Sequence, residues 1–220
     1  MSLPASTSIK CPECQSIFAI RYWNSINVTV DPALRQRVLD GSILRHRCPT
    51  CDQCIVVKTP VLYHDVQRRF MIWLDFEVPG QPPPTWRTET LEASAALLKQ
   101  YQFRLVSEWD ELVEKINIFE NGWDDRILET LKLFVIERVF PFRSQDFNES
   151  TARLTRLVDD GSEWPAFYFE IRRGDTVVGE GTVPSELYDK LAAGQEERFG
   201  KNYGAGEWTM VNKATILANG

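Results

Sequence analysis

Four of the five cysteines of this chain form two short units with the same pattern, Cys-Pro-x-Cys. The first unit spans residues 11–14 and the second spans residues 48–51. A Cys-x-x-Cys turn places two sulfurs on one edge of a tetrahedron, and a second turn completes the four soft ligands that Zn²⁺ prefers. The sequence therefore predicts one structural Zn²⁺ per chain, with the ligands Cys11, Cys14, Cys48 and Cys51.

Two other chemistries use the same cysteine spacing. A thioredoxin-type redox site has one Cys-x-x-Cys at a strand-to-helix turn, where the helix N-terminus lowers the thiol pKa. This chain has two units, and both lie between segments that are typical of strands. Structural disulfides are uncommon in reducing compartments. Zinc is the favoured interpretation, and redox or disulfide roles are the alternatives.

Two further residues near the second unit are alternative ligands. Cys51 and Cys54 form another Cys-x-x-Cys spacing, but it lacks the proline that the other two units share. We interpret Cys54 as a small strand residue, which is the usual role of a free cysteine. His46 precedes the second unit and is interpreted as a strand side chain. Whether either residue joins the metal site stays open at this point.

The segments around the cysteines predict a β-rich lobe that brings the two units together. Residues 16–30, 55–65 and 68–76 are rich in β-branched and aromatic residues, as strands are. Residues 31–41 predict a short helix, with Asp-Pro at its start and Gly41 in the left-handed position at its end. We expect residues 1–78 to form a zinc-ribbon-like lobe.

The rest of the chain predicts three more regions. A proline-rich linker covers residues 79–87, and a helical hairpin region covers residues 88–147. Residues 148–220 predict a C-terminal region with a strand, a β-hairpin and a helix. The fold class is therefore α+β, with a zinc-ribbon-like β-rich N-terminal lobe, a helical hairpin and a C-terminal β-hairpin/helix region.

The second helix of the hairpin, at about residues 125–140, is apolar around most of its circumference, which indicates burial on several sides. We expect Leu131, Phe134, Val135 and Val139 to be inaccessible. Leu133 and Ile136 need cover from either the C-terminal region or a second chain. The C-terminal region is favoured for Leu133, whereas the neighbouring apolar surface predicts a homodimer.

The charge distribution bears on the choice of partner. The net charge is −6, but residues 1–76 carry nine basic and six acidic side chains, so the first third is positive by three. Four thiolates around Zn²⁺ reduce that excess by two. We therefore favour a protein-interaction or scaffold role. Nucleic-acid binding is the alternative, and its basic and aromatic candidates are Arg21, Tyr22, Trp23, Arg35, Arg37, Arg45 and Arg47.

No catalytic constellation emerges from the sequence. Tyr63-His64-Asp65 with Cys54 suggests a nucleophilic triad, but strand alternation sends neighbouring side chains to opposite faces. Residues 194–202 resemble a phosphate-binding loop, yet the glycine spacing is one residue too long and Asn202 replaces the Mg²⁺-binding hydroxyl. An enzyme with a site between the lobes stays a second alternative without candidate residues.

The sequence offers no membrane or export signal. No apolar run approaches the twenty or so residues that a membrane helix needs, and the N-terminus lacks the apolar core of a signal peptide. We expect a cytoplasmic protein that does not bind membranes.

The twin Cys-Pro-x-Cys units resemble the bacterial CpXC family, which is named for them. Other stretches support the resemblance, which covers roughly residues 9–140: "NVTVDPALRQRVLDGSI", "VLYHD" and "LVEKINIFENGWDDRILETLK". It implies a metal site at the four cysteines and implies nothing about catalysis. Family members often have Gly after each unit, where this chain has Gln15 and Asp52. A left-handed turn suits Asp better than Gln.

Overall fold

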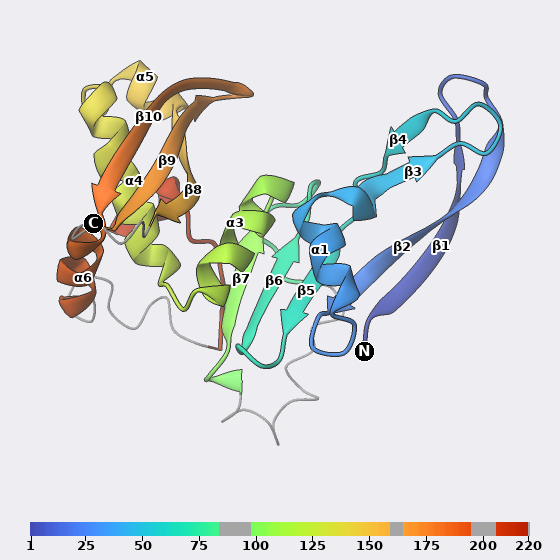
Figure 1. Ribbon diagram of the computed structural model, residues 1–220, viewed down its shortest axis with the longest axis horizontal. Coiled ribbons are helices and arrows are strands. Elements are labelled where there is room, and N and C mark those ends of the chain that lie inside the picture. The colour runs from blue at the N-terminus through green and yellow to red at the C-terminus, as the bar shows by residue number, and fades with distance from the viewer. Residues whose placement is uncertain (84–97, 159–164, 195–205, 220) are drawn as a thin grey trace. The chain divides into compact units, whose positions relative to one another are not determined.

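The computed structural model describes residues 1–83, 98–158, 165–194 and 206–219 (Figure 1). It has the mixed helix and strand composition expected from the sequence, with a β-rich N-terminal part. The chain divides into two compact units. The first unit comprises Met1–Ile116 and Gly204–Met210, and the second comprises Asn117–Tyr203 and Val211–Gly220.

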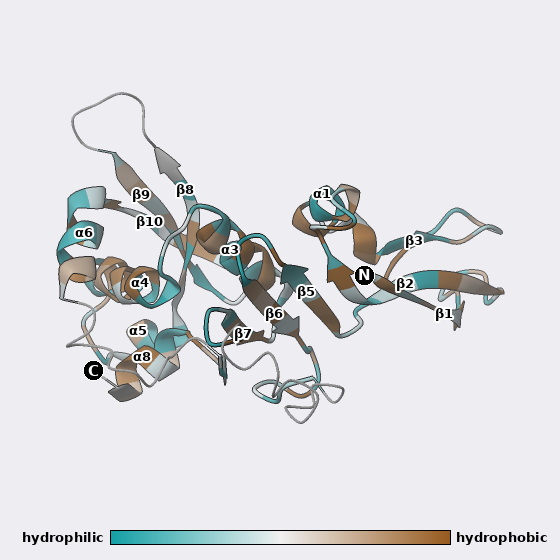
Figure 2. Cartoon of the chain, turned by 90° about the horizontal axis from the view of Figure 1, so that it is seen from below, coloured by the Kyte–Doolittle hydropathy of each residue, from teal (hydrophilic) through white to brown (hydrophobic). Residues whose placement is uncertain are grey.

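A six-stranded sheet forms the body of the first unit, in the order β1-β2-β5-β6-β7-β11. Neighbours β1 and β2, and also β5 and β6, are antiparallel, whereas the other pairs are parallel. The centre of this sheet is strongly hydrophobic (Figure 2), and every residue of β6 is buried. The strands are β1 Leu3–Lys10, β2 Ile17–Asn27, β5 Val61–Asp65, β6 Phe70–Leu74, β7 Gln102–Val106 and β11 Trp208–Thr209.

The boundary between the units differs from the one expected at the proline-rich segment 79–87. The chain enters β7 after that segment, and β7 pairs in parallel with β6 along its whole length. The sheet thus continues across the expected linker, and the described division falls inside α3 (Trp109–Glu120), between Ile116 and Asn117. Residues 84–87 of the expected linker lie outside the described residues.

Strands β1 and β2 extend beyond the body of the sheet and carry the first cysteine turn, and the second cysteine turn lies between β3 (Arg45–Arg47) and β4 (Cys54–Val56). Strand β5 pairs with β2 only at Ser25–Asn27, so residues 17–24 of β2 pair with β1 alone. A separate two-stranded sheet, β3 with β4, accompanies them. We call β1, residues 17–24 of β2, β3, β4 and their cysteine turns the arm; it lies at the blue end of the chain in Figure 1.

The connection from β2 to β3 contains the short helix expected at residues 31–41. Helix α1 covers Ala33–Leu39 and is followed by a 3₁₀ turn, η1 (Ser42–Leu44). Gly41 separates the two with φ 69°, which is the left-handed conformation predicted for it. Val38 and Ile43 are buried, so this connection packs against the rest of the first unit. It leads the chain from β2 to β3 of the arm.

The second unit is built around helix α4 (Asp125–Val139) and a three-stranded antiparallel sheet in the order β10-β9-β8. Asp124 caps α4 by accepting a hydrogen bond from the Arg126 N–H. The expected hairpin turns at Gly174, which has φ 54°. The remaining elements are α5 Gln145–Glu149, β8 Thr151–Val158, β9 Ala166–Arg173, β10 Thr176–Pro184, α6 Ser185–Ala193 and α8 Lys213–Asn219.

Burial along α4 corrects part of the expectation. Leu131 and Val135 are buried as predicted, and so is Ile136, but Phe134 is only half-buried and Val139 is 44% exposed. The helix contacts β8, β9 and β10 as well as α8 and α6, so its buried surface is rotated away from Phe134 and Val139.

The C-terminal helix supplies the cover that α4 needs on its other side. Leu133 is half-buried and packs against Val211 and Ile216, which are themselves buried. Within the described residues, the C-terminal region therefore covers Leu133, as the sequence favoured. Close approach of β10 completes the packing, since a Cβ on Gly181 would lie 2.4 Å from Val135 Cγ1.

Candidate metal centre

The two cysteine units fold into turns with the same hydrogen bonds. In the first, the Cys11 N–H donates to the Ser16 carbonyl (2.9 Å) and the Gln15 N–H donates to the Cys11 carbonyl (3.0 Å). In the second, the Cys48 N–H donates to the Gln53 carbonyl and the Asp52 N–H donates to the Cys48 carbonyl, both at 2.9 Å. These hydrogen bonds close each turn, so that the two cysteines of the turn lie close together.

The residue that follows each unit occupies the left-handed region, with φ 60° for both Gln15 and Asp52. Glycine adopts this conformation most readily, and other residues adopt it at some energetic cost. Gln15 offsets it by donating its Nε2 hydrogen to the Pro12 carbonyl at 2.9 Å. Asp52 forms an ion pair with Arg47 at 2.9 Å. The first turn therefore forms despite its glutamine.

The four cysteine sulfurs converge at the tip of the arm. Cys11 Sγ lies 3.7 Å from Cys51 Sγ, and Cys14 Sγ lies 3.6 Å from Cys48 Sγ. All four sulfurs lie within 4.8 Å of one another. Tetrahedral Zn²⁺ with Zn–S bonds of about 2.3 Å separates its sulfurs by about 3.8 Å. Each of these two pairs joins one turn to the other, so the donor set fits one metal ion that links the two turns.

Ser16 is part of this centre, although the sequence did not single it out. Its Oγ lies 3.1 Å from Cys14 Sγ and 3.3 Å from Cys48 Sγ, so it connects the two turns. The hydroxyl of Ser16 is the main cause that lowers the pKa of Cys48 to about 6, aided by the N–H groups of Thr50 and Cys51. Its contact with Cys48 joins residues 32 positions apart, so the spacing around Cys14 alone does not identify it.

The four thiols influence one another's ionisation. The Gln53 N–H lowers the pKa of Cys51, but burial and the neighbouring thiols outweigh it and raise that pKa to about 12. One thiolate of the set thus forms easily, whereas a further thiolate meets negative charge that is already present. A divalent cation removes this conflict, which is why the chemistry of the set suits a metal.

The alternative ligands lie outside the cluster that the described residues form. Cys54 is exposed in β4 opposite Arg47 and does not belong to the four-sulfur group. His46 does not belong to it either. Burial lowers the pKa of His46, and the positive charge of Arg37 lowers it further.

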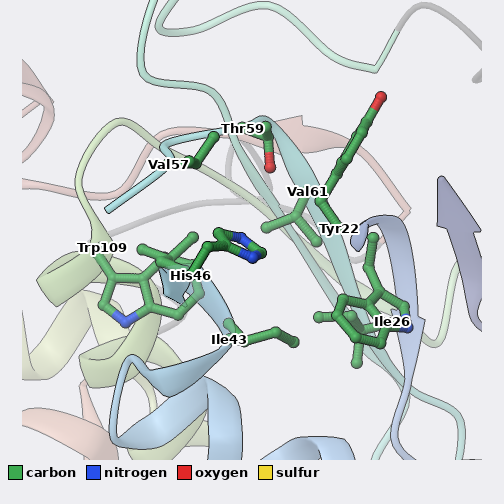
Figure 3. A pocket seen from close by; sticks show the side chains of 10 residues that line it. Tyr22, Ile26, Ile43, His46, Val57, Thr59, Val61 and Trp109 are labelled. Atoms are coloured by element: carbon green, nitrogen blue, oxygen red, sulfur yellow. The ribbon is translucent and has the colours of Figure 1, made fainter. Parts of the chain in front are cut away.

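Figure 3 shows the apolar pocket that receives the His46 ring, with Ile43, Val61 and Trp109 around it. The cavity has a volume of about 10 Å³, room for about one water molecule, so this pocket is part of the packing of the first unit. It is lined by Tyr22, Trp23, Ile26, Ile43, Leu44, His46, Val57, Thr59, Val61 and Trp109.

The residues considered for a catalytic triad make other contacts. His64 Nε2 lies 3.4 Å from the Tyr101 hydroxyl, and Asp65 accepts an ion pair from Arg68 at 2.9 Å. Cys54 belongs to the separate β3–β4 sheet. Apart from Gly194, the loop at residues 194–202 lies outside the described residues.

Most of the basic candidates gather at one place on the arm. A groove of about 730 Å³ is lined by Arg21 and Trp23 from β2, Arg45 and Arg47 from β3, and Arg37 from α1. Tyr22 faces the apolar pocket instead, and Arg35 does not line the groove.

The fold and the cluster define a mixed α/β protein with a four-cysteine centre of metal-binding type. Comparison with known protein families matches residues 9–132 to the family described as CpXC protein. This match covers more than half of the chain, and the chain belongs to the CpXC family. No curated protein matches the chain, and no solved structure does. Among the described residues, no helix is long and apolar enough to cross a membrane.

Proposed function

We propose that the protein is a zinc-stabilised recognition module, in which one structural Zn²⁺ shapes the arm and the arm binds a protein partner. The observation that carries this proposal is the spacing of the four sulfurs, which fits a closed tetrahedral shell. A closed shell of four thiolates has no open position for a substrate or an activated water, and such sites are structural. We propose zinc and not iron because a closed tetrahedron of four thiolates is a usual structural Zn²⁺ site and Zn²⁺ has no redox chemistry.

The composition of the arm explains why a metal is needed. Within β1, residues 17–24 of β2, β3 and β4, Ile20 is the one buried side chain that the structure describes. In the turns, Cys11 and Cys48 are buried, and they are ligands. Two hairpins with so little apolar contact do not hold each other by packing. The metal supplies the link, and we expect the reducing cytoplasm to preserve its thiolates.

Elemental analysis combined with hydrogen exchange tests this function. We expect one zinc per chain after purification without added metal. Removal of the metal with a chelator should abolish exchange protection in the arm and retain it in the second unit. A protein that contains no zinc, or an arm that stays protected after the metal is removed, would refute the structural-zinc role.

A second candidate function, nucleic-acid binding, is favoured by one observation, the four arginines that line the groove on the arm. Such a groove attracts phosphates, and binding would weaken steeply with rising salt. The overall charge of −6 and the two negative charges of a zinc tetrathiolate oppose it.

A further inference from the structure

The groove on the arm is strongly basic. Four arginines line it, and its other lining residues include no Asp or Glu: Phe18, Ala19, Ile20, Trp23, His46 and Pro49. Arg47 has an ion-pair partner in Asp52 at 2.9 Å, but both side chains are well exposed, so the pair is weak and exchangeable. Arg45 lies near Asp40 and lowers the pKa of that carboxyl after the larger effect of the Ser42 N–H. The groove keeps an excess of positive charge.

The walls of the groove are two strands with unpaired edges. Residues 17–24 of β2 pair with β1 on one side, and β5 reaches only Ser25–Asn27 on the other. Strand β3 pairs with β4 alone. Among the described residues, no backbone hydrogen bond joins β2 to β3. Each wall therefore presents free N–H and C=O groups along the groove, as a sheet edge does.

The aromatic residue of the groove is already in contact with cations. The guanidinium of Arg21 lies 5.4 Å from the centroid of the Trp23 ring, and that of Arg37 lies 5.2 Å from it. These cation–π contacts fix the positions of the two guanidinium groups. Trp23 thus orients charge in the groove, and its ring is not an open platform for another group.

We propose that the groove binds an extended acidic segment of a partner protein, which adds as a strand to a free edge and places its carboxylates on the arginines. Main-chain hydrogen bonds give such strand addition its affinity, and pockets for alternate side chains give its specificity. Side chains of an extended segment alternate between two faces, so every second residue reaches the same wall. Arginines bind carboxylates through paired, charge-assisted hydrogen bonds.

The same features argue against a nucleic acid as the occupant. Single strands bind through bases stacked on exposed aromatic rings, whereas Trp23 carries two guanidinium groups. A peptide backbone pairs with both the N–H and the C=O groups of a free strand edge, whereas a phosphate backbone accepts from the N–H groups but offers no donor to the carbonyls. An acidic peptide also brings fewer negative charges per length to a protein of net charge −6.

Fluorescence anisotropy on the full, zinc-containing chain tests the proposal. The probe is a labelled ten-residue peptide that alternates glutamate with threonine, at physiological salt. We expect binding to this peptide, and no binding to the peptide in which lysine replaces glutamate. Methylation of all backbone nitrogens in the acidic peptide should weaken binding at least about tenfold, because it removes the main-chain donors of both edges.

The matched protein variants are Arg37→Gln and Arg156→Gln. Both arginines are exposed and both make a cation–π contact, Arg37 with Trp23 at 5.2 Å and Arg156 with Tyr168 at 4.7 Å. We expect Arg37→Gln to weaken peptide binding about tenfold, since a charge-assisted contact is lost. Arg156→Gln, in β8 of the second unit, should change peptide binding by less than about twofold.

The inference rests on the proposed function, but the two fail in different ways. If the protein holds one zinc, keeps its arm protected from exchange and does not bind the acidic peptide, strand addition is refuted while the structural-zinc role stands. Equal binding of the methylated peptide would also refute it. If a ten-nucleotide oligothymidylate bound more tightly than the acidic peptide, with strong salt dependence, the proposal would be refuted and the occupant of the groove would be a nucleic acid.

Discussion

The arm and the second unit hold their strands in place by different means. The arm buries Ile20 and the two cysteines Cys11 and Cys48, and its turns meet at four sulfurs. The second unit has no such cluster among its described residues. Its sheet packs on α4 through large side chains that are almost fully buried, such as Phe167, Phe169 and Ile171.

This difference shows what each construction permits. Apolar packing requires most of the residues on one face of every element to be buried. A metal link requires only its ligands, so the other positions of a metal-linked hairpin stay available for charged and aromatic side chains. The exposed arginines of the arm occupy positions that a packed sheet would have used for its core.

The largest effect should come from breaking the metal link. We expect Cys48→Ser to abolish zinc binding and to unfold the arm, because structural zinc contributes on the order of 10 kcal/mol in finger peptides. Zinc content and hydrogen exchange measure this. Cys54→Ser is the matched control and should retain the metal, since Cys54 lies outside the four-sulfur group. If Cys54→Ser lost the metal and Cys48→Ser kept it, the second pair of ligands would be Cys51 and Cys54.

A charge introduced into the second unit should destabilise that unit and leave the metal centre of the arm unchanged. We expect Leu133→Glu to destabilise the second unit by about 2–5 kcal/mol, because it puts an unpaired carboxylate against Val211 and Ile216. Zinc content should not change. Val139→Glu, on the exposed side of the same helix, should change stability by about 1 kcal/mol or less.

Light scattering of the wild type and Leu133→Glu extends this test to the predicted homodimer. A dimeric wild type that becomes a stable monomer on substitution would show that α4 forms the interface between chains. A monomeric wild type, together with a monomeric but destabilised Leu133→Glu, would place the contribution of Leu133 inside the second unit.

A smaller effect should follow from adding a methyl group where β10 approaches α4 closely. Gly181→Ala places a methyl group 2.4 Å from Val135 Cγ1, so β10 or the helix must shift. We expect a loss of about 1–3 kcal/mol, as in other overpacked cores. Gly194→Ala is the control, because no atom of the part of the chain that the structure describes lies within 4 Å of its added Cβ. Thermal unfolding followed at the tryptophans reports both; equal midpoints for the two variants would contradict the close approach.

The smallest effect concerns a lysine that satisfies a helix end. Lys213 Nζ donates to the carbonyls of Phe147, Asn148 and Ser150 at the end of α5. Burial lowers the pKa of this lysine. We expect Lys213→Met to cost about 1–2 kcal/mol in urea unfolding, because the carbonyls lose their donor. Lys190→Met, which removes an exposed ion pair at 3.8 Å, should be nearly neutral.

The cysteine cluster was predictable because its information is local. Residue type and spacing define each turn, and four ligands of one kind satisfy one metal. The sequence did not reveal Ser16, since its role depends on Cys48, thirty-two positions away. Nor did it reveal that Gln15 adopts a left-handed conformation, whose cost is offset by the side-chain hydrogen bond from Gln15 to the Pro12 carbonyl.

The unit boundary and the buried face of α4 were harder to predict because both depend on distant pairing. Proline content indicates a change of direction, but it does not show that β7 returns to pair with β6. Helical periodicity indicates that α4 is buried on several sides. It does not say which sides the sheet and α8 will cover, so Phe134 and Val139 were assigned to the wrong set.

Strand β11 has a consequence for how the protein is made on the ribosome. It consists of Trp208–Thr209 and pairs in parallel with β7 at Phe103 and Arg104, and the chain passes through most of the second unit between them. Translation at about 5–20 residues per second takes roughly 5–20 s to cover that distance. During this time the nascent first unit carries β7 as an open edge, available to another strand. Trp208 and Thr209 close that edge, so the first unit is completed only after the intervening part of the second unit has been synthesised.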